Sequence, residues 1–220
     1  MSAWKEWPWQ LLAWLVSEVL LFVSRAWTGV RPLWVGAVPR LKQRVYFANH
    51  GSHGDFVMIW ACLPTHVRRV TRPVAGQDYW LASWARRFAA SRVFRALLID
   101  RHPKPDAPSP VALMGEVLRQ GDSLILFPEG TRNTTDASLL PFKSGLYHLS
   151  QQSPDVEFVP VWIDNIRRVM PKGELIPVPL ICTVSFGPPL VLDAQEGKEA
   201  FLQRAQAAVL ALRPQESLSC

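Results

Sequence analysis

The chain has 220 residues, of which 49% are hydrophobic, and this length favours a single domain with a sizeable core. Its mean hydropathy of +0.06 lies at the apolar end of the range for soluble proteins. The net charge of +6 favours an anionic partner, such as a phosphate-bearing lipid, a nucleic acid or a membrane surface. Lysine and arginine are not gathered in one tract, which argues against a disordered arm that binds nucleic acid. The cysteines are odd in number and form no C-x-x-C pair, which favours a reducing cytosolic setting over a disulfide framework: Cys62, Cys182 and Cys220.

Residues 8–24 form an apolar run near the start of the sequence, interrupted by Gln10, Ser17 and Glu18. The run is shorter than the roughly 20 residues of a clean transmembrane span, and Glu18 would be costly at the centre of a bilayer. Nearby tryptophans suit the headgroup level, where an amphipathic ring contacts both water and lipid: Trp4, Trp7, Trp9 and Trp14. We therefore expect residues 1–30 to form a membrane-associating helix that dips into one leaflet. A short single span and a helix packed on the protein are the alternatives.

Basic residues follow this run and would face the cytoplasmic side in either membrane arrangement: Arg25, Arg31, Arg40, Lys42 and Arg44. A cleaved signal peptide is not expected, because Glu6 offsets Lys5 and the residues around Arg25 make a poor cleavage site. The expected location is therefore the cytoplasmic face of the inner or plasma membrane.

Residues 44–212 alternate between short apolar runs and amphipathic stretches. The expected strands cover residues 44–48, 67–75, 97–99, 123–127, 157–163 and 180–186. The expected helices cover residues 56–63, 80–96, 111–120, 143–152 and 196–212. This alternation predicts one α/β domain over residues 31–220, with a mixed, largely parallel central sheet flanked by helices.

Polar motifs follow three of the expected strands. The first contains His50 and Asp55, the second is Asp100-Arg101, and the third spans residues 128–132, Pro-Glu-Gly-Thr-Arg. Ligands of open α/β sheets bind beyond the strand ends, so the three motifs can converge on one pocket. An Asp55 carboxylate that accepts a hydrogen bond from one ring nitrogen of His50 would leave the other nitrogen free as a base. Each motif also has an ordinary explanation, namely a solvated loop residue, an N-cap aspartate or a turn.

Taken in order, these motifs resemble those of the glycerolipid acyltransferases, a family that includes the bacterial 1-acylglycerol-3-phosphate acyltransferases. The resemblance covers about residues 44–190 and rests on four motifs: His50-x-x-x-x-Asp55, Leu98-Ile99-Asp100-Arg101, Phe127-Pro128-Glu129-Gly130-Thr131-Arg132 and Val159-Pro160-Val161. In this sequence His53 lies inside the first motif. Arg95-Ala96 stands before the second motif, where a glycine is common in the family.

The resemblance implies an enzyme that moves a fatty-acyl group from an acyl thioester to the free hydroxyl of a lysophospholipid. The first candidate acceptor is 1-acylglycerol-3-phosphate, which would give phosphatidic acid. His50 would take the hydroxyl proton as that oxygen attacks the thioester, and Asp55 would orient His50. Arg101 and Arg132 would bind the phosphate of the acceptor. Backbone N–H groups of the glycine-rich segments could hold the oxyanion.

Four further residues belong to the site that the resemblance implies. Glu129 would bind the glycerol portion or brace its loop, and Gly130 would allow close backbone approach. Thr131 would assist binding or only form the turn. Lys143 would add positive charge at the phosphate or be an exposed lysine at a helix start. The donor would be acyl-CoA or acyl-ACP as a cosubstrate, and neither a further cofactor nor a metal ion is expected.

Other hypotheses remain open at this point. The acceptor could be a lysolipid without phosphate, such as a lyso-ornithine-type aminolipid. His50-x-x-His53-x-Asp55 could hold a metal ion. Residues 121–124, Gly-Asp-Ser-Leu, spell a serine lipase motif, although the G-x-S-x-G elbow is absent. A non-enzymatic module that binds a membrane or nucleic acid would leave the ordered polar motifs unexplained, so nucleic acid is not an expected partner.

Overall fold

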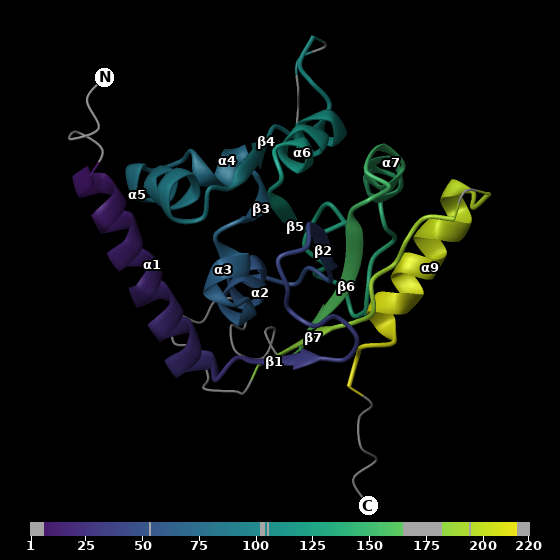
Figure 1. The fold of residues 1–220 in the computed structure, drawn as a ribbon, viewed down its shortest axis with the longest axis horizontal. Helices are drawn as coiled ribbons and strands as arrows, with labels where there is room; N and C mark the ends of the chain where they lie inside the picture. Colours follow the sequence, from purple (N-terminus) through teal and green to yellow (C-terminus); the bar gives the residue numbers. More distant parts are fainter. Residues whose placement is uncertain are drawn as a thin grey trace, which may run out of the picture.

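The structure of the chain is a computed structural model that describes residues 7–52, 54–101, 104, 106–164, 182–193 and 195–214. Its described strands form one seven-stranded sheet with helices on both faces (Figure 1). The strands are β1 (Arg31–Trp34), β2 (Arg44–Ala48), β3 (Thr71–Gly76), β4 (Leu97–Ile99), β5 (Ser123–Leu126), β6 (Glu157–Ile163) and β7 (Thr183–Phe186). The helices are α1 (Trp7–Thr28), α2 (Asp55–Cys62), α3 (Thr65–Arg68), α4 (Gln77–Trp80), α5 (Trp84–Phe88), the π-helical turn η2 (Ala89–Val93), α6 (Pro110–Arg119), α7 (Gly145–Gln152) and α9 (Lys198–Leu210).

The strand order across the sheet is β1-β7-β6-β2-β5-β3-β4. Strands β6, β2, β5, β3 and β4 are parallel to one another, whereas β7 is antiparallel to β6 and β1 is parallel to β7. The expected fold class is therefore confirmed: a mixed, largely parallel sheet flanked by helices, with an apolar N-terminal helix. Because parallel strands end at one edge, the loops after β2, β5 and β4 share that edge of the sheet.

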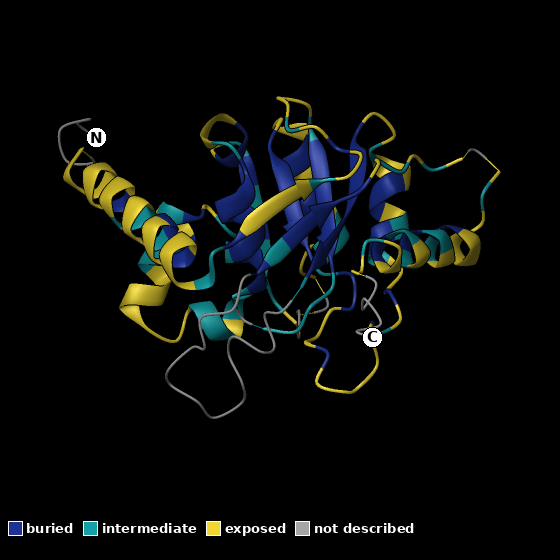
Figure 2. Ribbon diagram, turned by 90° about the horizontal axis from the view of Figure 1, so that it is seen from below, coloured by how far each residue is buried: buried dark blue, intermediate teal, exposed yellow. Residues whose placement is uncertain are grey.

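Strand β2 lies between β6 and β5 in the middle of the sheet, and all five of its residues are buried. Successive side chains of a strand point to opposite faces. Tyr46 and Ala48 join a core with residues of α2, whereas Val45 and Phe47 join a second core with residues of α6, α7 and α9. The central strands are accordingly dark blue in Figure 2. Burial on both faces explains why the sequence of β2 is nearly all apolar after Arg44.

Two of the three cysteines are described, and both are free and buried. Burial raises the pKa of the Cys62 thiol to about 12 and that of the Cys182 thiol to about 11. Both thiols therefore stay protonated near neutral pH and offer no thiolate nucleophile. Cys220 lies outside the described residues.

Helix α1 has 22 residues and extends beyond the apolar run of residues 8–24. At ~1.5 Å per residue it is about 33 Å long, which compares with a hydrocarbon core of about 30 Å. By length and composition alone, it is the one described helix that could cross a bilayer, a criterion that core helices and signal sequences also meet. The helix is thus longer than the apolar run, and its dip into one leaflet stays a prediction. The helix buries few side chains against η2 and α2, and its outward face is exposed (Figure 2): Leu11, Leu15, Val19, Phe22 and Val23.

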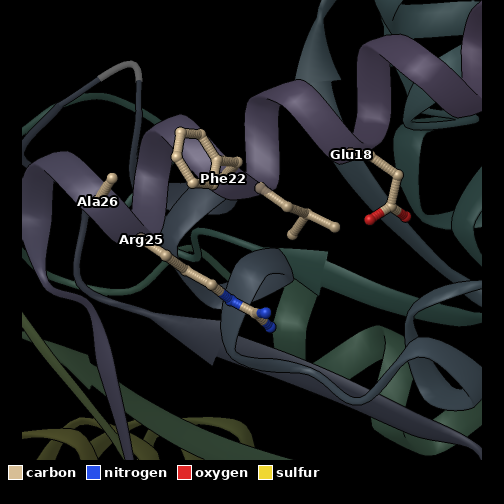
Figure 3. Close-up of a pocket in the computed structure, with 5 residues that line it drawn as sticks. Glu18, Phe22, Arg25 and Ala26 are labelled. Atoms are coloured by element: carbon tan, nitrogen blue, oxygen red, sulfur yellow. The ribbon is translucent and has the colours of Figure 1, made fainter.

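The charged residues of α1 lie on a flank that faces the rest of the protein (Figure 3). Glu18 and Arg25, about two helical turns apart, line a hollow of about 440 Å³ with Leu21, Phe22 and Ala26. Nη2 of Arg25 donates a 3.0 Å hydrogen bond to the carbonyl of Ala61 in α2. Glu18 is also close enough to Arg68 to act on its charge. The acid that would be costly in a bilayer thus lies at the border of the outward apolar face, since Phe22 lines the same hollow.

One expected strand is displaced and one strand was not expected. The expected strand over residues 67–75 begins only at Thr71, because the preceding residues form the short helix α3. Strand β1 was not predicted from the sequence, since it is a four-residue edge strand that contains Pro32. Proline is tolerated there because an edge strand pairs on one side only.

The expected single helix over residues 80–96 is broken into α5 and η2, with α4 before it. Ser83 has an extended backbone with φ of −144°, and its Oγ accepts the backbone N–H of Arg86 at 3.3 Å, so Ser83 caps a new helix. At the other end, Arg95 adopts a left-handed backbone with φ of 51°, which ends the helical path before β4. This is the position before the second motif where a glycine is common in the family, and the backbone is one that glycine favours.

At the amino-terminal edge of the sheet, Glu157 binds three cations. Its Oε1 accepts from Nη2 of Arg40 and Nζ of Lys42 at 2.8 Å each, and its Oε2 accepts from Nε of Arg44 at 2.9 Å. Arg44 is 1% exposed, so its charge depends on this partner. Burial opposes ionisation of the carboxyl, but the hydrogen bonds from Lys42, Arg44 and Arg40 outweigh it and lower the pKa of Glu157 to about 2. These three basic residues, expected on the cytoplasmic side of the membrane, thus also bind within the fold.

We expect Glu157→Gln to lower the free energy of unfolding near pH 7 by about 2–4 kcal/mol, because it leaves Arg44 buried without a counter-charge. The folded-state pKa of about 2 lies below the ordinary value of 4.5. The carboxylate therefore stabilises the folded protein above pH 4.5, and this stabilisation is lost as the pH falls towards 2. Urea unfolding of the two proteins should converge as the pH is lowered from about 7 to about 3. Glu116→Gln, which removes a surface partner of Arg119, is the control and should have a much smaller effect. A difference in unfolding free energy between wild type and Glu157→Gln that stays constant with pH would contradict the role given to the Glu157 carboxylate.

Candidate active site

The loop after β2 folds around the carboxylate of Asp55. Oδ2 of Asp55 lies 2.8 Å from Nδ1 of His50 and accepts the backbone N–H groups of Gly51 and Ser52 at 2.7 and 2.9 Å. Asp55 is 1% exposed and is the first residue of α2, while Gly54 occupies the N-cap position without a side-chain hydrogen bond. Asp55 is thus not an N-cap. One carboxylate sets both the shape of the loop and the orientation of the imidazole.

Phe127 and Asn49 support His50 from other sides. The imidazole stacks on the ring of Phe127 with the ring centroids 4.2 Å apart and the planes at 15°. Asn49 exchanges two hydrogen bonds with the backbone of Ile163 at the end of β6, at 3.0 and 2.8 Å. Because Nδ1 faces Asp55, Nε2 is the ring nitrogen left for a ligand, and the side chain is 16% exposed. The sequence did not mark Asn49 or the stacking role of Phe127, since both depend on contacts between strand ends.

Glu129, the acid of the motif after β5, braces the loop after β2. It is 3% exposed. Its Oε1 accepts the backbone N–H of His50 at 2.7 Å, and its Oε2 accepts the backbone N–H of Leu140 at 2.9 Å. Both carboxylate oxygens already accept hydrogen bonds from the protein, so of the two roles considered for Glu129 this geometry favours bracing.

Asn133 forms a second brace that the motifs did not reveal. Its backbone N–H donates to the carbonyl of His50 at 2.7 Å, so the main chain of His50 is held on both its N–H and its C=O side. The buried side chain of Asn133 donates to the carbonyl of Ala137 at 2.7 Å and accepts the backbone N–H of Thr135 at 3.0 Å. Asparagine often bonds to nearby backbone in turns, so its position after Arg132 was the available signal.

Gly130 and Lys143 lie against each other. Gly130 has a φ of 69°, and a Cβ at this position would lie 2.6 Å from Cε and 2.7 Å from Nζ of Lys143. Glycine is thus favoured by the backbone, whereas the flexible end of the exposed Lys143 side chain could shift to admit a Cβ. The backbone N–H of Lys143 donates to the carbonyl of Pro128 at 2.8 Å. These contacts place the ammonium group of Lys143 against Gly130, although Lys143 follows the motif of residues 128–132 only after a long loop.

Arg101 follows β4 and lies over the end of β3. A Cβ at Gly76 would come 2.8 Å from Nε of Arg101, and Nη1 of Arg101 lies 3.7 Å from Oδ2 of Asp78. Both side chains of this ion pair are more than half exposed, which makes the pair weak. The partner Asp78 did not emerge from the motifs, because it belongs to α4.

The remaining motif residues, Thr131 and Arg132, are exposed at the same edge of the sheet as His50. Strand β5, which delivers Arg132, adjoins β2, which delivers His50. Strand β4, which delivers Arg101, is three strands away from β2, or about 14 Å at ~4.8 Å per strand. By strand position, Arg132 is therefore nearer to His50 than Arg101 is.

Two alternative sites find little support in the described residues. Within them, no group of three or more His, Cys, Asp or Glu side chains could hold a metal ion, and His53, which the metal hypothesis needs, lies outside them. Ser123 of the lipase motif is 2% exposed, and its Oγ accepts the backbone N–H of Arg44 at 3.0 Å. Ser123 begins β5, whereas His50 follows the end of the parallel strand β2, so the two residues lie at opposite edges of the sheet.

We expect Gly130→Ala to destabilise the fold more than Gly121→Ala. Both glycines have left-handed backbones, with φ of 69° and 87°, but a Cβ at Gly121 would meet nothing within 4 Å. The backbone change alone should cost about 1 kcal/mol at either glycine, and displacement of the flexible Lys143 side chain should add about 0.5 kcal/mol at Gly130. Urea unfolding of both variants measures the difference. Lys143→Ala should recover the additional cost in the Gly130→Ala protein, and equal losses for the two glycines would show that Lys143 does not lie against Gly130.

Comparisons with known proteins identify relatives of the chain. A family model described as Acyltransferase matches residues 36–164. The chain is 31% identical over 159 residues to a 1-acyl-sn-glycerol-3-phosphate acyltransferase of Limnanthes douglasii, which covers 69% of this chain and 52% of the relative. It is 30% identical over 138 residues to a Salmonella typhimurium protein of the same name, which covers 60% of this chain and 51% of the relative.

The fold is also similar to a solved structure, that of the 1-acyl-sn-glycerophosphate (LPA) acyltransferase PlsC from Thermotoga maritima. The TM-score is 0.68, and the match covers 93% of this chain and 83% of that chain. At 19% sequence identity this likeness shows a common fold. The chain spans about half the length of the curated relatives that it matches.

Proposed function

This chain belongs to the acyltransferase family, and we propose that it transfers a fatty-acyl group from an acyl thioester to the free hydroxyl of a lysophospholipid. The observation that carries the proposal is the 2.8 Å contact between His50 and Asp55, at the sheet edge that also presents Arg132. The names of the relatives, 1-acyl-sn-glycerol-3-phosphate acyltransferases, support 1-acylglycerol-3-phosphate as the first acceptor and phosphatidic acid as the product.

His50 would act as the general base. With Nδ1 held by Asp55, Nε2 would accept the proton of the acceptor hydroxyl as its oxygen attacks the thioester carbonyl. The buried Asp55 carboxylate would stabilise the imidazolium that forms. When the tetrahedral intermediate collapses, the ester C–O bond is complete, the C–S bond breaks, and the imidazolium returns its proton to the leaving thiolate. The acceptor oxygen attacks directly, so this route needs no enzyme nucleophile.

The oxyanion of the tetrahedral intermediate needs backbone donors, and the described glycine amides of the two motif loops already donate within the protein. The N–H groups of Gly51 and Ser52 donate to Asp55, and that of Gly54 donates to a hydroxyl of the same loop at 3.2 Å. The N–H of Gly130 donates to a backbone carbonyl at 3.0 Å. The amides expected to hold the oxyanion therefore already bind within the protein, and the donor would be another group at this edge.

The phosphate of the acceptor would bind beside Arg132 and Lys143. Arg132 is exposed on the strand end next to His50, and the ammonium of Lys143 lies over Gly130 of the same motif. A guanidinium group can hold two phosphate oxygens at once, and an ammonium adds a point charge. Arg101 lies farther along the sheet edge and is paired with Asp78, so we expect a smaller contribution from Arg101.

We expect His50→Ala to lower kcat by about 10²–10⁴-fold, because the hydroxyl loses its proton acceptor. Asp55→Asn should also lower kcat strongly, since it removes the charge that stabilises the imidazolium. Thiol release from the donor at saturating lysolipid measures both changes. His66→Ala, at an exposed histidine of α3, is the matched control and should keep its activity. Full thiol release by His50→Ala would overturn the mechanism.

Arg132→Ala should raise the KM for 1-acylglycerol-3-phosphate by about 10–100-fold, the value of a lost hydrogen bond to a charged group, while the KM for the donor stays constant. Arg101→Ala should give a smaller increase. Arg119→Ala, at an exposed arginine of α6, controls for the loss of one positive charge. An unchanged acceptor KM in Arg132→Ala would point to an acceptor without phosphate, such as a lyso-ornithine-type aminolipid.

The donor in this proposal is acyl-CoA or acyl-ACP as a cosubstrate, and the steps above use no further cofactor and no metal ion. Residues 1–30 would hold the enzyme at the cytoplasmic face of the membrane, where both donors and the lysolipid are accessible, and residues 31–220 would form the catalytic domain. The exposed apolar face of α1 supports this arrangement. Purified protein offered a panel of lysolipids with each donor, with and without chelator and with products identified by mass spectrometry, tests the reaction directly.

A further inference from the structure

We propose that residues 81–87, Leu-Ala-Ser-Trp-Ala-Arg-Arg, form a second membrane-contact surface that docks on a bilayer with anionic lipid headgroups. This segment, termed the 81–87 surface, begins directly after α4, includes all of α5 except Phe88, and is separate from the N-terminal residues 1–30. Docking on lipid is a property of the surface itself and does not depend on the acyl-transfer reaction.

All residues of the 81–87 surface are exposed, including its two large apolar side chains. Leu81 is 48% exposed and Trp84 is 61% exposed. A single exposed apolar residue is ordinary, but neighbouring apolar groups that include a tryptophan mark a surface for association. Tryptophan is also the side chain that best suits the boundary between water and lipid, because its ring is amphipathic.

The 81–87 surface continues the apolar surface of α1 through a row of three rings. Trp84 stacks on Phe88 with centroids 5.7 Å apart, and Phe88 contacts Trp9 of α1 with centroids 6.2 Å apart. Trp9 is itself 44% exposed. Helix α5 lies beside α1 in Figure 1, and the exposed run lies next to the exposed face of α1 in Figure 2. A bilayer that receives α1 is therefore adjacent to Trp84 as well.

The positive charge around the 81–87 surface favours a membrane with anionic lipids over a neutral one. Residues 79–99 contain four arginines and no acidic residue. Arg86 and Arg87 are exposed within the 81–87 surface, and the guanidinium of Arg86 lies 4.1 Å from the ring centroid of Tyr79. A basic group close to an anionic membrane surface gains attraction that a neutral bilayer does not provide. On such a membrane the apolar rings would contact the lipid below the headgroups, and the flanking arginines would contact the anionic headgroups.

The position of the surface also links the membrane to the edge of the sheet. Helix α4 comes directly before Leu81 and carries Asp78, the ion-pair partner of Arg101. Docking through the 81–87 surface would hold this part of the sheet edge next to the headgroups from which a lysolipid must arrive. This consequence, unlike the docking, rests on the proposed function.

Vesicle flotation of the full chain tests the proposal in the absence of donor and acceptor. The partition coefficient is measured at limiting lipid with vesicles of phosphatidylcholine alone and with vesicles that contain about one quarter phosphatidylglycerol. Leu81→Ser/Trp84→Ser should lower binding to both kinds of vesicle by about 10-fold or more, because it removes apolar area that docking would bury in the lipid. Arg86→Gln/Arg87→Gln should lower binding to the anionic vesicles by about 10–30-fold, and far less to the neutral ones.

Matched controls lie on the other side of the molecule. Val191→Ser/Leu210→Ser removes two exposed apolar side chains, and Arg119→Gln/Arg213→Gln removes two positive charges. Both controls should bind as wild type. The same comparison in a Leu15→Ser/Phe22→Ser background prevents α1 from masking the effect. Equal partition of the test and control variants in that background would overturn the proposal, as would a change confined to oligomeric size in solution, which would make the surface a contact between copies of the chain.

Discussion

Oδ2 of Asp55 gathers three donors in the loop after β2: Nδ1 of His50 and the backbone N–H groups of Gly51 and Ser52. The carboxylate is 1% exposed, and its other oxygen, Oδ1, is buried without a hydrogen-bond partner among the described residues, so the three bonds to Oδ2 carry the whole stabilisation of this buried charge by hydrogen bonds. The same bonds that stabilise the loop therefore orient the imidazole and leave Nε2 as the ring nitrogen that can meet a ligand. The shape of the loop and the orientation of His50 thus depend on one carboxylate oxygen.

Two buried glutamates hold the central strand β2 at its two ends. At the amino end, Glu157 of β6 binds Arg44, and at the carboxyl end Glu129 of the loop after β5 binds the backbone of His50. Each acid comes from a strand or loop next to β2. The loop after β2 is therefore held in place by its neighbours in the sheet as well as by its own hydrogen bonds. Asn133 completes this hold at the carbonyl of His50.

Helix α1 exposes a row of apolar side chains, and Arg25 joins the helix to the end of α2 through its hydrogen bond to the carbonyl of Ala61. The ring row from Trp9 to Trp84 extends this apolar surface towards the part of the sheet edge that carries Arg101. The exposed rings of α1 and α5 thus lie on the same flank of the molecule as the part of the sheet edge that carries Arg101.

The fold class could be predicted from the amino-acid pattern alone, because alternating apolar runs and amphipathic stretches admit few arrangements other than a helix-covered sheet. The meeting of His50 and Asp55 was predictable as well, since the two residues are five positions apart at the end of one strand. Which strands are neighbours is visible only in the folded chain, and with it that Glu129 and Asn133 hold His50 and that Arg132 is nearer to His50 than Arg101 is. The break at Ser83, the left-handed Arg95 and the contact of Lys143 with Gly130 were likewise beyond sequence patterns. Each depends on contacts that form only when the chain is folded, and the local hydrophobic pattern does not predict such contacts.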